Sequence, residues 1–153
     1  MATATGSQLE VGHVGLNVTD LARSTRFYRE ALGLDLAGES TAAGREYAFL
    51  AHEGRLLITL WRQSDGSAPT DRPGLHHLAF LVESIKEVRE AEKRLRALGA
   101  VIHHHGIVPH RDGGDSGGLF FEDPDGIRLE IYAPTGAGEH PAPHSDAPTC
   151  GFF

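Results

Sequence analysis

The chain has 153 residues, and 14 Lys and Arg against 21 Asp and Glu leave a net charge of −7 at pH 7. This length suits one domain with its own hydrophobic core, and 40% hydrophobic residues are typical of a globular protein. The acidic balance argues against a nucleic-acid-binding protein, which needs a basic face. The single cysteine, Cys150, excludes an internal disulfide.

Neither a leader nor a membrane span is expected. The first residues, Met1–Gln8, are small and polar and lack the basic and apolar regions of a signal peptide. The longest apolar stretch, Leu75–Val82, is interrupted by two histidines and is too short to cross a bilayer. We therefore expect a cytoplasmic protein with a small-molecule substrate and with no nucleic-acid or membrane partner.

The chain reads as two copies of one βαβββ unit. In the first copy, residues 9–62, an apolar strand at 11–18 leads to Asp20, which is placed to cap a helix that ends at Gly33. Three strand-like stretches follow, and they are Leu34–Glu39, Glu46–Ala51 and Arg55–Trp61. A polar linker with two prolines, residues 63–74, then separates the copies.

The second copy, residues 75–133, repeats this order. A strand at 75–83 is followed by Ser84, which with Glu87 forms a capping box for a helix that ends at Gly99. The expected strands after it are Ala100–His104, Leu119–Glu122 and Ile127–Tyr132, separated by a glycine-rich loop at 106–118 and an Asp-Pro-Asp-Gly turn. Residues 1–133 are therefore expected to form a single α+β domain.

Residues 134–153 differ in composition from the rest. Four prolines among Gly, Ala and Ser suit an extended or mobile tail, which ends in the apolar tip Cys150–Phe153. Two interpretations are open. The tip is a frayed end that covers exposed apolar surface, or it docks near the active site or on a neighbouring subunit.

Equivalent positions in the two copies suggest a metal site. His13 and His77 lie near the starts of equivalent strands, and the last strands align Thr59 with Glu130. His13, His77 and Glu130 would form a facial triad that leaves up to three coordination positions open, as catalytic sites do. A substrate with two adjacent oxygens could chelate an ion there. The alternative is that both histidines are core residues and Glu130 merely faces outward on its strand.

Other residues complete the expected pocket. Neighbours on a strand face opposite sides, and the repeat selects His77 over His76. If the loop at 106–118 is a lid, His110 is the best general acid–base candidate, and Arg111 could hold a substrate anion. Thr59 and the aromatic residues of the first copy either line the pocket or pack in the core, and the aromatic candidates are Phe49 and Trp61.

Three segments carry a family resemblance. They are H-V-G-L-N-V-T-D-L from His13, G-L-H-H-L-A-F-L-V around His77, and F-F-E-D-P-D-G-I-R-L-E up to Glu130. Here the chain resembles the vicinal oxygen chelate superfamily from about residue 10 to residue 133. The resemblance implies two modules that form a curved, mixed eight-stranded sheet around a divalent ion (Fe, Mn, Zn or Ni). It places that ion on the same three ligands. We expect a homodimer, and related folds pair their modules either within one chain or between two.

Departures from individual members narrow the expected activity. Thr59 stands where glyoxalase I enzymes have a glutamate ligand and epimerases a glutamine, and Phe121 stands where extradiol dioxygenases have a tyrosine. No arginine follows Glu130 as in fosfomycin-resistance enzymes, and bleomycin-resistance proteins generally lack the triad. We therefore expect a metalloenzyme for a small oxygen-rich organic molecule, first an extradiol-like dioxygenase and second an isomerase, lyase or glutathione-type transferase. The alternative is a protein that sequesters a drug or natural product.

Overall fold

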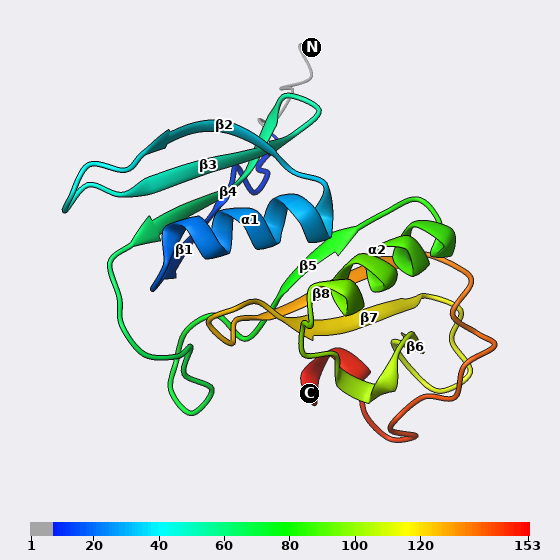
Figure 1. Cartoon of the computed structure of the whole chain (residues 1–153). Helices are drawn as coiled ribbons and strands as arrows, with labels where there is room; N and C mark the ends of the chain where they lie inside the picture. The colour runs from blue at the N-terminus through cyan, green and yellow to red at the C-terminus, as the bar shows by residue number, and fades with distance from the viewer. Residues whose placement is uncertain (1–7) are drawn as a thin grey trace, which may run out of the picture.

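The computed structural model describes residues 8–153 and shows two modules in chain order (Figure 1). The first contains β1 (Val14–Val18), α1 (Leu21–Leu32), β2 (Asp35–Ser40), β3 (Tyr47–His52) and β4 (Arg55–Arg62). The second contains β5 (Leu78–Leu81), α2 (Ile85–Ala97), the short 3-10 helix η1 (His103–His105), β6 (Val108–Pro109), β7 (Gly117–Glu122) and β8 (Arg128–Ala133). A second 3-10 turn, η2 (Thr149–Gly151), lies in the tail.

Most of the Met1–Gln8 stretch, for which the sequence predicts no leader, lies outside the described residues. Within residues 8–153, neither helix has the length and apolar character that crossing a membrane requires.

The eight strands form two four-stranded sheets with the same topology. Their orders are β1-β4-β3-β2 and β5-β8-β7-β6, and in each sheet the first strand of the module runs parallel to the last. Gly15 lies opposite Thr59 in the first sheet, and Ala79 lies opposite Glu130 in the second. Gly15 follows His13 by two residues, and Ala79 follows His77 by two residues. The first and last strands therefore pair in the same register in both modules. The predicted α+β fold of two βαβββ modules is confirmed, and within the chain the expected eight strands are divided between two mixed four-stranded sheets rather than forming one.

Both helices begin and end where their capping residues predict. The Asp20 side chain accepts a hydrogen bond from the backbone N–H of Arg23 at 3.0 Å, and Gly33 ends α1 with a φ of +69°. Ser84 and Glu87 form the expected capping box of α2. These local signals determine where each helix begins and ends.

The predicted strand at Ala100–His104 is wrong. Ile102 forms only an isolated bridge to Phe121, and the chain then turns into η1, where His104 has a left-handed φ of +56°. Three consecutive histidines give no alternation of apolar and polar residues that would hold an extended strand in register. The edge strand is instead β6, which pairs with the glycines that open β7.

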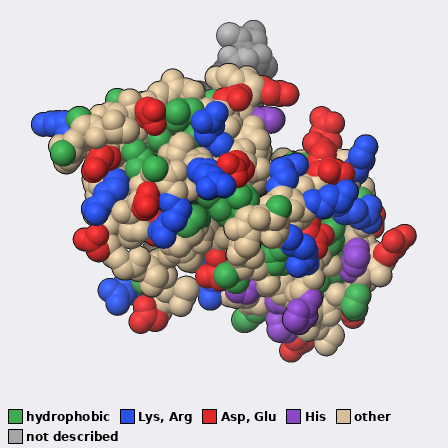
Figure 2. Space-filling view, in the orientation of Figure 1, with side chains coloured by type: hydrophobic (Ala, Val, Ile, Leu, Met, Phe, Trp, Pro, Cys, Tyr) green, Lys and Arg blue, Asp and Glu red, His purple; other side chains and the backbone are tan. Residues whose placement is uncertain are grey.

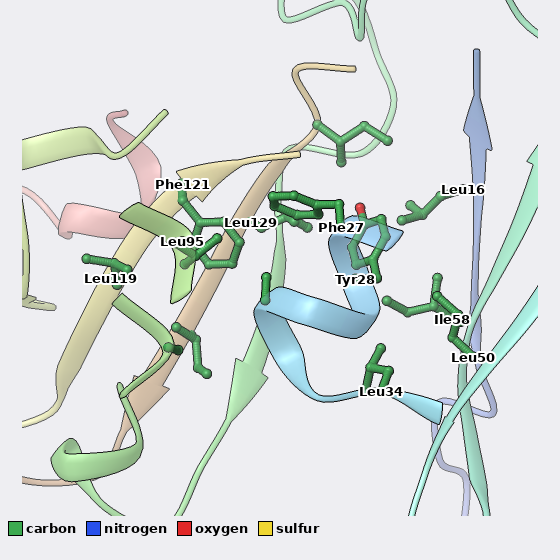
Figure 3. Packing of buried hydrophobic residues seen from close by; sticks show 14 of the residues in the cluster. Leu16, Phe27, Tyr28, Leu34, Leu50, Ile58, Leu95, Leu119, Phe121 and Leu129 are labelled. Atoms are coloured by element: carbon green, nitrogen blue, oxygen red, sulfur yellow. The ribbon is translucent and has the colours of Figure 1, made fainter. Parts of the chain in front are cut away.

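Helix α1 lies between the two sheets and joins the modules (Figures 1 and 3). The Phe27 and Phe121 rings are 6.4 Å apart, and the buried Tyr28 hydroxyl donates a hydrogen bond to Asp123 at 2.8 Å. Arg94 of α2 donates to the carbonyl of Ala31 at 3.0 Å. Because one continuous core contains residues of both modules, each sheet packs through its helix-facing side. The opposite side of each sheet is called here the helix-distal face.

Candidate metal centre

Glu130 lies at the middle of β8, between two core residues. Leu129 and Ile131 face the helices, so the side chain of Glu130 belongs to the helix-distal face of the second sheet. It is only 2% exposed. A buried carboxylate is costly unless charged or polar groups meet both of its oxygens.

Two imidazoles meet the carboxylate oxygens of Glu130. His110 Nε2 forms a hydrogen bond with Oε1, and His77 Nε2 lies 3.6 Å from Oε2. His110 follows β6, whereas His77 directly precedes β5, so the three residues come from separate stretches of the second module. They form the cluster His77–His110–Glu130.

The hydrogen bonds of His110 hold its ring so that Nε2 faces Glu130. An ionised carboxylate only accepts hydrogen bonds, so His110 Nε2 carries the proton. His110 Nδ1 lies 2.9 Å from the Ser116 hydroxyl, which also donates to the Ala133 carbonyl at 3.4 Å. The backbone N–H of His110 also donates to the Ser116 carbonyl at 2.8 Å. His110 is thereby held so as to orient the carboxylate of Glu130.

His77 has the protonation state that a metal ligand needs. Burial lowers the pKa of the His77 imidazole, and the nearby Glu130 carboxylate only partly opposes this effect. Its other ring nitrogen, Nδ1, lies 2.8 Å from Nδ1 of the exposed His76. Of these two neighbouring histidines, His77 is therefore the one that approaches Glu130, and its imidazole is neutral at neutral pH.

The third residue of the predicted triad lies elsewhere. His13 is exposed and precedes β1 in the first module, whereas His77 and Glu130 lie together in the second. Across residues 8–153, no three His, Cys, Asp or Glu side chains are grouped so that they could hold a metal ion. The sequence therefore brings two of the three predicted ligands together within one chain, and His110 joins them.

The predicted pocket residues of the first module form a separate group. Thr59 is 2% exposed and accepts a hydrogen bond from Trp61 Nε1 at 2.9 Å. The rings of Tyr47, Phe49 and Trp61 lie 4.9 to 6.0 Å apart, on the helix-distal face of the first sheet. Arg111 is exposed in the loop after β6. These side chains do not belong to the cluster around Glu130.

The tail folds back onto the second sheet. The Thr149 hydroxyl donates to the Pro109 carbonyl at 2.6 Å, and the Thr149 N–H donates to the His110 carbonyl at 2.9 Å. Beyond this anchor, the Phe153 ring lies 5.7 Å from the His77 ring. Figure 2 shows histidine side chains gathered over this part of the second module. The tail tip therefore lies beside His77 and also covers the ring of Phe120.

Comparisons with known proteins agree with this architecture. The chain is 29% identical over 137 residues to a catechol-2,3-dioxygenase of Bacillus subtilis, a match that covers 86% of this chain and 44% of the relative. The chain thus spans less than half of that relative's length.

Two solved structures are similar to this chain over most of its length and over nearly all of their own. A glyoxylase/bleomycin resistance protein/dioxygenase domain from Frankia has a TM-score of 0.69 and 29% identity, covering 84% of this chain and 99% of that one. A fosfomycin resistance protein, FosX, of Listeria monocytogenes has a TM-score of 0.63 and 26% identity, covering 84% and 93%. That protein was solved as a mutant in complex with Mn(II) and 1S,2S-dihydroxypropylphosphonic acid.

A family profile described as "Glyoxalase/Bleomycin resistance protein/Dioxygenase superfamily" matches residues 10–131. This range includes the first module, the second module up to Ile131 in β8, and all three predicted ligands. The chain therefore belongs to the glyoxalase/bleomycin resistance protein/dioxygenase superfamily.

Proposed function

We propose that the chain is a metal-dependent enzyme that acts on a small organic molecule with two neighbouring oxygens. The observation that carries the proposal is the buried Glu130 carboxylate, which has an imidazole at each oxygen. An extradiol-like dioxygenase reaction is the first choice, supported by the similarity to a catechol-2,3-dioxygenase. A lyase, isomerase or transferase reaction is the second.

The donor chemistry of these residues fits a divalent ion. One carboxylate and neutral imidazoles are ligands for Fe, Mn, Zn and Ni, and they leave coordination positions open for a substrate. We assign His77 and Glu130 as two protein ligands. His110 holds the Glu130 carboxylate through Nε2, which is the usual role of a residue that orients a ligand.

The third proposed ligand is His13 of a second copy of the chain. His13 and His77 have the same register relative to Thr59 and Glu130, so the two helix-distal faces are related by the internal repeat. Within one chain the modules pack through α1, which leaves the helix-distal face of the first sheet available to another copy. In a twofold dimer, each site would combine one face from each chain.

The ion and the side chains of the protein would have different roles in the reaction. A divalent ion bound there would stabilise negative charge on the substrate oxygens as a Lewis acid. The chain's own groups would supply the charge of Glu130, its orientation by His110, and apolar walls. Phe49, Trp61 and Thr59 of the second copy would form the wall opposite Glu130, and Arg111 at the loop remains the proposed contact for a substrate anion.

A sequestering protein of the bleomycin-resistance type is the second candidate function. The aromatic group of Tyr47, Phe49 and Trp61 favours it, because three clustered rings can hold a flat apolar ligand without any metal. Metal content separates the two candidates, since only the enzyme requires a stoichiometric ion.

The test is metal binding by untagged protein purified without a nickel column. We expect the parent chain to bind Mn(II) stoichiometrically in a chelator-competition titration. The His77→Ala variant should lose most of that affinity while keeping its fold, since the core does not include the site. The neighbouring His76→Ala variant is the matched control and should bind as the parent does. Equal affinity for Mn(II) in the parent and His77→Ala, or no stoichiometric Mn(II) binding by the parent, would reject the enzyme proposal.

A further inference from the structure

The Phe153 ring occupies a cage on the helix-distal face of the second sheet. Its centroid lies 4.9 Å from that of Phe120, 5.4 Å from that of His103 and 5.7 Å from that of His77. The Arg128 guanidinium carbon lies over the ring at 5.4 Å from its centroid. With the His76 ring at 6.2 Å, four rings and a cation therefore surround one aromatic side chain of the tail.

This placement is specific to one of two adjacent phenylalanines. Thr149, which is fully buried, anchors the segment by its two hydrogen bonds to the strand and loop that carry His110. Phe152 is 56% exposed, and its ring lies 5.8 Å from the ring of His144. The anchor thus directs the Phe153 ring into the cage and leaves the Phe152 ring largely in solvent.

The chemistry of the cage selects an aromatic ring. The edge-to-face and tilted contacts of Phe120, His77 and His103 depend on the charge distribution of a π-system. A guanidinium over a ring face is attracted by the same distribution. A saturated ring of equal size would fill the space without either attraction.

The cage is also adjacent to the candidate metal centre. His77 contributes to both, and Phe120 lies directly opposite Glu130 in the register of β7 and β8. Arg128 precedes Glu130 by two residues on β8 and faces the same side of the sheet. A ring held in the cage would thus lie beside the Glu130 carboxylate.

We propose that this cage is a binding subsite for an aromatic ring and that Phe153 occupies it in cis, so that a ligand ring must displace the tail. The inference that the substrate carries an aromatic ring rests on the proposed function. The inference that the cage binds an aromatic ring does not depend on a metal ion.

The test uses the full-length chain with EDTA present and phenol as the probe, and binding is followed by NMR titration. If the tail fills the cage for at least nine-tenths of the time, Phe153→Ala should bind phenol about tenfold more tightly than the parent. Phe152→Ala is the matched control and should bind phenol as the parent does. Phe153→Trp keeps a ring in the tail and should not gain affinity. Cyclohexanol, the saturated counterpart of phenol, should bind Phe153→Ala more weakly than phenol does, because it lacks both attractions.

Three outcomes would overturn the proposal. They are equal phenol affinity in the parent and Phe153→Ala, the same gain in Phe152→Ala, and binding of cyclohexanol to Phe153→Ala as tight as that of phenol. Because the titration is metal-free, it is separate from the metal test above. A chain that binds no metal but gains phenol affinity in Phe153→Ala would refute the enzyme and leave the aromatic subsite intact.

Discussion

Glu130 is buried although it lies on the helix-distal face of the second sheet, where neither helix packs. The His110 imidazole forms a hydrogen bond with the Glu130 carboxylate, and the polar Nε2 of His77 lies 3.6 Å from its other oxygen. Removing one partner of a buried charged group leaves the other without compensation, so changes at these three residues affect stability as well as ligand binding. Their effects on metal binding therefore have to be measured on protein whose fold has been verified.

His104 gives the molecule a pH-dependent stability. Its Nε2 is buried without a hydrogen-bond partner, and burial is the main cause that lowers the pKa of its imidazole below the ordinary value of 6.5. Because the folded-state pKa is the lower one, the unfolded chain takes up the proton first. The stabilising contribution is therefore complete above pH 6.5 and is lost as the pH falls through the folded-state pKa.

The variant His104→Asn removes this titration and keeps a residue type that tolerates the left-handed φ of +56°. We expect the free energy of unfolding to fall less in this variant than in the parent when the pH is lowered from about 7.5 to about 5. The measurement is urea denaturation at both pH values. His52→Asn, at an exposed histidine of β3, is the control and should keep the parent's pH dependence. An unchanged pH dependence in His104→Asn would refute the prediction.

At the scale of elements, a buried hydrogen bond links α1 to the turn between β7 and β8, beside the partly exposed Arg23–Asp125 ion pair. The Tyr28 hydroxyl donates to Asp123, and burial raises the pKa of both groups. Tyr28→Phe should lower the free energy of unfolding by about 1–3 kcal/mol, because a buried acidic side chain loses a donor. Urea denaturation of Tyr28→Phe, with Tyr47→Phe at a half-buried tyrosine as control, checks this value. A loss no larger than in the control would show that the hydrogen bond contributes nothing to joining the modules.

The close pairing of β7 with β8 depends on Gly118. A Cβ at this position would lie 2.5 Å from the Cα of Tyr132, a backbone atom that cannot turn aside. We expect Gly118→Ala to lower the free energy of unfolding by more than about 4 kcal/mol or to prevent folding. Gly12→Ala has no atom within 4 Å of the added Cβ and should change stability by less than about 0.5 kcal/mol. Thermal unfolding of the two variants side by side would decide, and similar melting curves would contradict the expectation.

The elements that the sequence predicted well are those with local signals. Asp20, Gly33 and the Ser84 capping box mark the helix ends, and the alternating strands of β4 and β8 define their two faces. The two-residue strand β6 has no such pattern, because its pairing depends on glycines that follow a loop. This is why the edge strand was predicted at Ala100–His104 instead.

In the candidate site, too, the sequence predicted the residues in regular strands and missed those placed by loops. The repeat identified His77 and Glu130 as neighbours, because both lie in regular strands or directly before them. The contact of His110 with Glu130 depends on how a loop closes, and no periodicity determines that. The position of Phe153 depends on the long-range anchor of Thr149 to Pro109, for which the sequence holds no local signal.

At the scale of the whole molecule, the arrangement of modules determines where the ligands lie. The two sheets share a core through α1, so His13 and His77 belong to different faces of one chain. In the proposed function, a complete triad would combine His13 of a second copy with His77 and Glu130 of the first. Each dimer would hold two such sites, related by the twofold axis.

The most direct test of this claim is metal binding by mixed dimers of His13→Ala and His77→Ala. Each variant alone lacks one ligand in every site, so each should bind little Mn(II). After equal amounts are unfolded and refolded together, random pairing gives mixed dimers in which one of the two sites is intact. The mixture should then recover about a quarter of the parent's bound Mn(II). A mixture that binds no more metal than the average of the two separate variants would contradict the shared site.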